Sequence, residues 1–209
     1  GDLTRAGRIS AEEGDYLLGF CNNVSPAFLT GFCMTKSLKR PDLAGPALLL
    51  AFGMPVLAGI LTRRGRTFSS LPAEKKTSGS QISFKIADAC IMNGLESILK
   101  LGCYIILFSM LARLLRGVPC PYPALTCALV GILEITNGIS LTAAQDLPFW
   151  LSFGLILGIS SFGGLSGMAQ TQSMIQDSGL SILSYLKTKI LTAIPAAVCA
   201  LILGRGLLS

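Results

Sequence analysis

The sequence predicts an all-α, polytopic membrane protein, because it is apolar, poorly charged and interrupted by helix-breaking residues inside its apolar runs. Of the 209 residues, 51% are hydrophobic and only 13% are charged, whereas charged residues make up about a quarter of a typical soluble domain. Uncharged runs such as 43–62 and 147–176 reach the roughly 20 residues that one helical span requires. Prolines, glycines and polar side chains inside such runs indicate broken helices.

The basic residues gather in short polar stretches and give a formal net charge of +6. The groups at 36–40 and 63–66 flank the apolar run 43–62, which is typical of short loops on the cytoplasmic face of a membrane. No aromatic platform or recognition motif accompanies the charge, so we expect no nucleic-acid partner. The expected partner is the lipid bilayer, and the sequence leaves open whether the protein forms a homo-oligomer.

Residue types that carry catalysis or bind metals are scarce. The seven cysteines are scattered without a CxxC pair, and the chain has no histidine, which argues against a zinc site and a disulfide framework. Without histidine, a GxSxG motif or a pair of catalytic aspartates, little remains for acid/base or nucleophilic chemistry. We therefore expect no enzymatic activity, no catalytic residue, no metal and no cofactor.

Residues 1–66 are predicted to hold a capped helix, a broken segment and one plain span. A helix should start directly after Ser10, because Ser10 and Glu13 have the spacing of a capping box. The plain span is 43–62, bounded by basic residues on both sides. Residues 67–83, rich in Ser, Lys, Thr and Gly, are predicted to form a polar loop.

The broken segment lies at 16–35, where polar residues and a proline interrupt the apolar pattern. The interrupting residues are Asn22, Asn23, Ser25 and Pro26, and an interior proline removes a helix hydrogen bond. Backbone groups freed in this way cannot face lipid, so they are expected to be buried against protein or to line a wet cavity.

Residues 84–209 are predicted to hold two transmembrane helices, a broken hairpin and a terminal helix. The first helical pattern runs over 84–116, and the second, 124–141, follows a turn with three prolines in five residues. The run 147–176 is too long for one straight span, and its middle, SSFGGLSGMAQTQS, should break it. The last helix has an amphipathic start with Tyr185, Lys187 and Lys189, followed by the apolar run 190–204.

Glu134 lies near the centre of the predicted span 124–141. A carboxylate at that depth costs a few kcal/mol unless it is paired or hydrated, so it indicates a functional site. Asn93 and Glu96 are also three residues apart, among the polar residues of the predicted helix 84–116. Residues three apart share a helix face. The predicted coupling-ion or proton residues are Glu134, Asn137, Asn93 and Glu96. A structural partner for Glu134 and a solvated face for the earlier pair are the alternatives.

A loose internal repeat relates residues 6–34 to residues 177–204. Each copy has a Gly/Ser start, an amphipathic turn or two, and a proline before small and apolar residues. Inverted repeats with interrupted helices are the sequence indication of a transporter binding site. We therefore expect re-entrant, broken-helix hairpins in an inverted repeat. We expect the N-terminal part of the first repeat to be absent from this chain. The sequence starts at Gly1, without an initiator Met or a signal peptide, so we expect a fragment or a processed form.

The restart of each broken helix offers free N–H groups and a positive dipole end to an anion. On this basis the predicted substrate-binding residues are Asn22, Asn23, Ser25, Gly163, Gly164, Ser166, Gln170 and Gln172. The alternative for the polar side chains is hydrogen bonding between helices, and for the glycines it is close helix packing.

Several blocks of the chain together resemble a known family. GRISAEEGDYLL, CNNVSPAFLTGF, EITNG, FGGLSGMAQTQSMI and DSGLSILSYLKTKIL are similar to the YlbJ-type sporulation integral membrane proteins, within the group that carries nucleoside-recognition or Gate domains. The resemblance covers nearly the whole chain. It implies an architecture similar to concentrative nucleoside transporters, a place in a bacterial cell or forespore membrane, and movement of dipicolinate, a small aromatic dicarboxylate.

The family and this chain differ at the N-terminal end. Family members have further N-terminal helices before the position of Gly1, so a missing N-terminal segment of the same protein is an expected partner. The expected function is therefore transport or facilitated movement of a small organic anion. A nucleoside transporter and a non-transporting structural membrane protein of sporulation are the alternatives.

Overall fold

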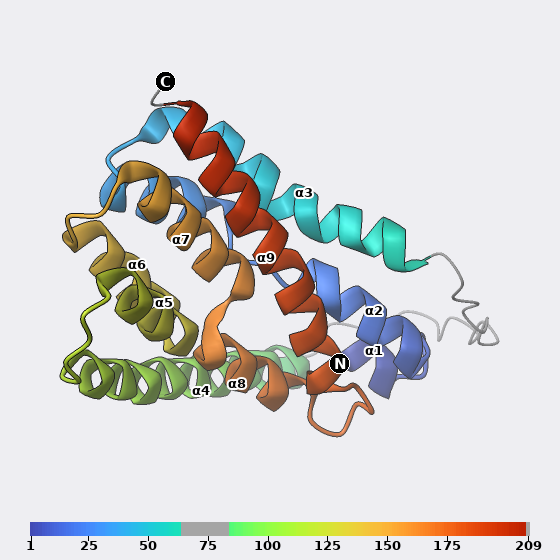
Figure 1. The fold of residues 1–209 in the computed structure, drawn as a ribbon. Coiled ribbons are helices and arrows are strands. Elements are labelled where there is room, and N and C mark those ends of the chain that lie inside the picture. The colour runs from blue at the N-terminus through green and yellow to red at the C-terminus, as the bar shows by residue number, and fades with distance from the viewer. Residues whose placement is uncertain (64–83, 208–209) are drawn as a thin grey trace.

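The computed structural model describes residues 1–63 and 84–207, and every regular element in these ranges is helical (Figure 1). The predicted all-α class is therefore confirmed. In chain order the elements are α1 (Asp2–Arg5), α2 (Ala11–Cys21), the π-helical η1 (Phe28–Ser37), the 3₁₀ turn η2 (Pro41–Leu43), α3 (Ala44–Arg63), α4 (Phe84–Arg116), α5 (Pro123–Leu133), α6 (Ile135–Ala144), α7 (Phe149–Phe162), α8 (Gly164–Ile175) and α9 (Ile182–Gly206). The polar loop predicted at 67–83 lies outside the described residues.

Four helical segments of the described residues are long and apolar enough to cross a membrane. These are Pro41–Arg63, Phe84–Arg116, Phe149–Ile175 and Ile182–Gly206. They correspond to the apolar runs that the sequence predicts as spans. Many of their large apolar side chains are exposed, as expected for helices that contact lipid tails.

Helices α7 and α9 lie side by side because small residues let their backbones approach (Figure 1). A Cβ atom on Gly154 would lie 2.4 Å from Leu201, and one on Gly158 would lie 3.0 Å from Ala197. Such small-residue contacts are typical of helix packing in membranes. The hydrophobic core includes α7, where the side chain of Phe153 is fully buried.

Helix α4 has the predicted bounds but packs on little of the chain. Only Ala112 is buried among its 33 residues. In Figure 1, α4 runs beside α5 and α8, and these two helices are its main contacts. The polar residues of its first half, including Asn93 and Glu96, are exposed.

The predicted span 124–141 is divided at Glu134 into two short helices, α5 and α6. Glu134 itself is extended, with φ −147° and ψ 122°. The two helices approach closely, because a Cβ atom on Gly138 would lie only 2.1 Å from the Cα of Gly131. At 1.5 Å per residue each half is roughly 15 Å long, about half the thickness of the hydrocarbon core. The sequence does not predict this break, because residues 124–141 contain no proline.

The two segments of the loose repeat differ in the structure. The first is interrupted after Cys21, whereas α9 continues through Pro195. Pro55 likewise lies inside a continuous α3. The inverted repeat and the re-entrant passage of the hairpins therefore stay predictions.

Candidate functional site

The helix interruptions at Asn22, Glu134 and Gly163 meet at one pocket of about 250 Å³. They come from three separate parts of the chain. Six of the residues predicted from sequence line this pocket: Asn22, Asn23, Glu134, Gly163, Ser166 and Gln170. Apolar side chains of α4 and α6 complete it, among them Leu101, Ile105 and Ile135. The lining of the pocket therefore combines polar and apolar residues.

The interruption at Gly163 arises from two consecutive glycines in the left-handed region. Gly163 has φ 85° and Gly164 has φ 71°, a conformation that costs glycine little and other residues more. The N–H of Gly163 still bonds the carbonyl of Ile159 at 3.0 Å, which closes α7. Helix α8 then starts at the pocket. Within it, the side-chain amide of Gln170 donates to the hydroxyl of Ser166, one turn earlier, at 3.2 Å.

Glu134 is a buried carboxylate that caps the start of α6. It is only 2% exposed. Its Oε1 accepts from the backbone N–H of Thr136 at 3.1 Å, and its Oε2 accepts from the N–H and the side-chain amide of Asn137 at 2.8 and 2.7 Å. The hydroxyl of Thr136 donates to Oε2 as well. A negative charge at a helix N-terminus is favourable, so this half-helix stabilises the buried carboxylate.

Asn137 links this carboxylate to another helix. Its side-chain amide also donates to the hydroxyl of Ser109 on α4 at 2.9 Å. Asn137 does not itself line the pocket, but it orients the carboxylate of Glu134, which does.

Lys189, in α9, supplies a buried ammonium group to the same pocket. The residue is 2% exposed. Its Nζ donates to the backbone carbonyl of Asn22 and, at 3.0 Å, to the side-chain oxygen of Asn23. Asn22 is the residue that follows the last turn of α2. A cation is favourable at a helix C-terminus, so α2 and α9 stabilise one another through this contact.

The sequence predicts Lys189 only as part of an amphipathic helix start, so the predicted site does not include it. The spacing contains a usable signal, because Tyr185 and Lys189 stand four apart and share a helix face, whereas Lys187 lies on the other side. In the structure Tyr185 is 4% exposed, and Lys187 is exposed.

Asn22 is held by a small network. Its side-chain amide donates to the hydroxyl oxygens of Thr171 at 3.0 Å and Tyr185 at 3.1 Å. The amide of Asn23 donates to the carbonyl of Phe20 at 2.6 Å, which fixes the side-chain oxygen of Asn23 toward Lys189. These bonds connect the end of α2 to α8 and α9.

The other predicted site residues lie outside the pocket. Ser25 accepts a bond from the N–H of Phe28 at 3.1 Å and so caps the resumed helix. Gly164 contributes to the break, but a Cβ atom there would lie 3.1 Å from the side chain of Ile135. Gln172 is exposed.

Asn93 and Glu96 also lie outside the pocket, on the exposed first half of α4. Glu96 forms a 2.7 Å ion pair with Lys100 one turn later. The arrangement corresponds to the solvated face that the sequence left open for these two residues.

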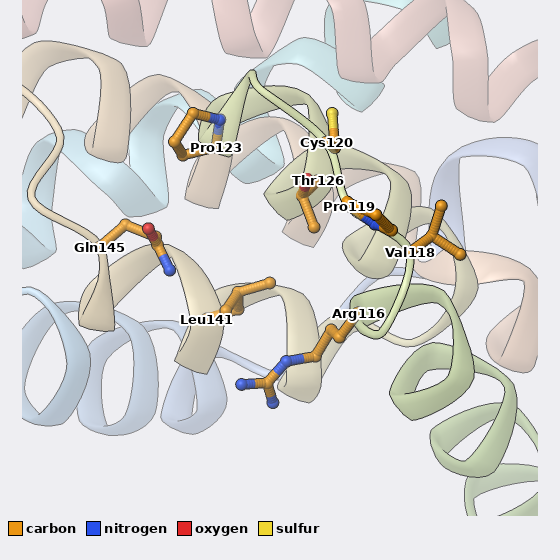
Figure 2. Close-up of a pocket in the computed structure, with 8 residues that line it drawn as sticks. All are labelled: Arg116, Val118, Pro119, Cys120, Pro123, Thr126, Leu141 and Gln145. Atoms are coloured by element: carbon orange, nitrogen blue, oxygen red, sulfur yellow. The ribbon is translucent and has the colours of Figure 1, made fainter.

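A second pocket, of about 320 Å³, lies at the turn between α4 and α5 (Figure 2). Figure 2 shows the guanidinium of Arg116 extending from the end of α4 toward the helix that carries Leu141 and Gln145. None of the residues predicted for the site lines it. Its ionisable lining residues, Arg116 and Cys120, are exposed, so it lacks the buried charges of the first pocket.

Comparison with known proteins gives one relevant similarity. No family model matches the chain, and no solved structure matches it. The chain is 25% identical over 247 aligned residues to the Sporulation integral membrane protein YlbJ of Bacillus subtilis (strain 168). The alignment covers 98% of this chain and 59% of that relative, so the chain spans about three-fifths of the length of the relative. Together with the membrane-length apolar helices, this similarity identifies an integral membrane protein related to a YlbJ sporulation protein.

Proposed function

We propose that this protein moves a small organic anion across a membrane, and that the anion binds in the pocket where the helix interruptions meet. The observation that supports this proposal is that a buried carboxylate, Glu134, and a buried ammonium, Lys189, both line one pocket. Ionisable groups inside membrane segments are costly and mark substrate or ion pathways.

The arrangement of helix ends supports the same proposal. Transporters commonly place their sites where interrupted helices present dipole ends and free backbone groups to a ligand. Here α2 ends at the pocket, and α6 and α8 begin there. A scaffold protein gains nothing from such breaks, because each one gives up helix hydrogen bonds.

The size of the pocket favours a compact ligand. A volume of about 250 Å³ lies below the roughly 300–1,000 Å³ of sites for drug-sized ligands. A small dicarboxylate suits this volume better than a nucleoside, which is the runner-up ligand. Since the relative is named for sporulation, we propose dipicolinate as the anion and a bacterial cell or forespore membrane as the location.

We also propose Glu134 and Asn137 as the residues that hold a coupling proton or cation. Their contact is short, at 2.7 Å, and Glu134 faces the pocket. A change in the charge of Glu134 would therefore be felt by a ligand bound beside it.

Uptake into proteoliposomes tests the proposal. Reconstituted full chain should accumulate radiolabelled dipicolinate, and both Glu134→Gln and Asn22→Ala should abolish uptake without lowering membrane abundance. Glu12→Gln, an exposed carboxylate in the first turn of α2, serves as the matched control and should leave uptake unchanged. Uptake that survives both site changes would show that the site is assigned wrongly.

Binding separates the two candidate ligands. A ligand that binds only the folded state raises the apparent stability, so dipicolinate should raise the melting temperature of the purified protein more than uridine does. The reverse order would favour the nucleoside.

A further inference from the structure

We infer that Lys189 binds the carboxylate of the ligand and selects anions over neutral molecules of the same shape. This inference rests on the proposed function, because it assigns the anion of that proposal to one side chain. It also sets the chemical class of the ligand, which is a compact carboxylate with an apolar body.

The hydrogen bonds of Lys189 leave capacity for a ligand. An ammonium group carries three donors, and within residues 1–63 and 84–207 it meets two oxygen acceptors, the carbonyl of Asn22 and the side-chain oxygen of Asn23. The ring of Tyr185 lies 5.5 Å from the same nitrogen, a weaker contact that leaves one donor without an oxygen acceptor. Both acceptors are neutral. A buried ammonium without a carboxylate partner attracts an anion strongly, because water is largely excluded around it.

Glu134, a buried carboxylate of the same pocket, cannot bind a ligand carboxylate, because it offers only acceptors. Thr136 and Asn137 give three donors to its Oε2 and one to its Oε1. The remaining acceptor position, at Oε1, suits a proton or a cation. Of these two groups, Lys189 is the one with a donor that suits a carboxylate.

The contact between Lys189 and α2 reduces the positive charge without removing it. The C-terminus of a helix carries roughly half a negative charge, which leaves an excess at the ammonium. Lys189 is also 98% buried, since only 2% of it is exposed.

The apolar lining residues of the pocket suit an apolar ligand body. These residues are Val24, Leu101, Ile105 and Ile135. A ring or hydrocarbon that contacts their side chains is removed from water, which favours binding. This arrangement disfavours a fully polar anion such as inorganic phosphate.

Charge discrimination by the purified full chain tests the inference. The two probes are dipicolinate and its neutral diamide, pyridine-2,6-dicarboxamide, which has nearly the same shape. Wild-type protein should prefer dipicolinate by at least about tenfold in Kd, the effect of one charge-assisted hydrogen bond. Lys189→Met should remove this preference, Lys189→Arg should retain most of it, and the exposed Lys187→Met should leave it unchanged.

A structural cap would give a different result. If Lys189 only holds α2 in place, Lys189→Met weakens both probes equally and the preference persists, which overturns the inference. A wild-type protein that binds both probes equally, or neither, overturns it as well. Should Lys189→Met fail to fold, Asn23→Asp provides the second variant. It keeps Lys189 but supplies a competing carboxylate, and it should lower the preference; an unchanged preference counts against the inference.

The proposed function fails separately. Dipicolinate uptake with an undiminished preference in Lys189→Met rejects the role of Lys189 and retains transport. Selective carboxylate binding without uptake in vesicles retains the role of Lys189 and rejects transport.

Discussion

The ammonium nitrogen of Lys189 lies 3.0 Å from the side-chain oxygen of Asn23, although 166 residues separate them along the chain. This contact joins the N-terminal third of α9 to the residues that follow α2. It places a buried ammonium beside neutral oxygens. The stability of the fold and the chemistry of the pocket therefore depend on the same side chain.

Changing Asn23 to Asp should weaken anion binding. The new carboxylate pairs with the ammonium of Lys189 and so competes with a ligand carboxylate for it. Aspartate also cannot donate the 2.6 Å bond that the Asn23 amide gives to the carbonyl of Phe20, so the substitution should not raise the melting temperature. The Kd for dipicolinate of the purified protein measures the competition, and Asn93→Asp, on the exposed half of α4, is the control that should leave this Kd unchanged. An Asn23→Asp variant that binds dipicolinate as tightly as wild type would contradict the expectation.

Changing Glu134 to Gln should destabilise the start of α6. Glutamine replaces one acceptor oxygen with an amino group, which would face donors from Thr136 or Asn137. Loss of charge-assisted bonds and an unpaired donor should cost about 1.5–3 kcal/mol. Thermal unfolding of the purified protein measures this, with exposed Glu12→Gln as the control. Equal melting temperatures for the two variants would show that the cap contributes little.

Changing Gly138 to Ala should disrupt the contact between α5 and α6. The added Cβ would lie 2.1 Å from the Cα of Gly131 and 2.6 Å from its N, and backbone atoms cannot move aside without separating the helices. Overpacking of this kind costs about 1–3 kcal/mol or more. Gly53→Ala in α3 meets no atom within 4 Å and should not destabilise the protein. A Gly138→Ala variant as stable as that control would rule out the close approach.

Changing Gly163 to Ala should strain the break between α7 and α8 without a steric clash. No atom lies within 4 Å of the added Cβ, but the φ of 85° is unfavourable for any residue with a side chain. The cost should be about 1–2 kcal/mol. Gly163→Asn should cost less, because asparagine tolerates the left-handed region better. Unfolding measurements on both variants check this order; if Asn destabilises more than Ala, strain at φ is not the cause.

Local patterns were enough to predict most helix limits. Ser10 caps α2 through the N–H of Glu13 at 3.1 Å, as the capping box predicts. Helix α4 begins and ends at the predicted residues, 84 and 116. The break at Gly163 falls inside the glycine-rich stretch where the sequence predicts one. Each of these features depends on residues within a turn or two, so the local sequence contains the necessary information.

The break at Glu134 and the burial of Lys189 were not predicted. Glu134 has no neighbouring proline to end the helix, and α5 turns into α6 because Gly131 and Gly138 allow the two helices to fold together. The sequence around Lys189 is typical of a helix start at a membrane surface. Its true environment is created by Asn22 and Asn23, which come from the other end of the chain.

By itself, the sequence determined that the chain is helical and embedded in a membrane, since composition and the length of apolar runs suffice for both. It also marked most of the places where helices stop. Only the tertiary structure decided that the breaks at Asn22, Glu134 and Gly163 share one pocket, and that Lys189 supplies its ammonium. The physical reason is that a buried charge must be stabilised by helix ends and polar groups nearby, and their positions follow from long-range packing rather than from local sequence.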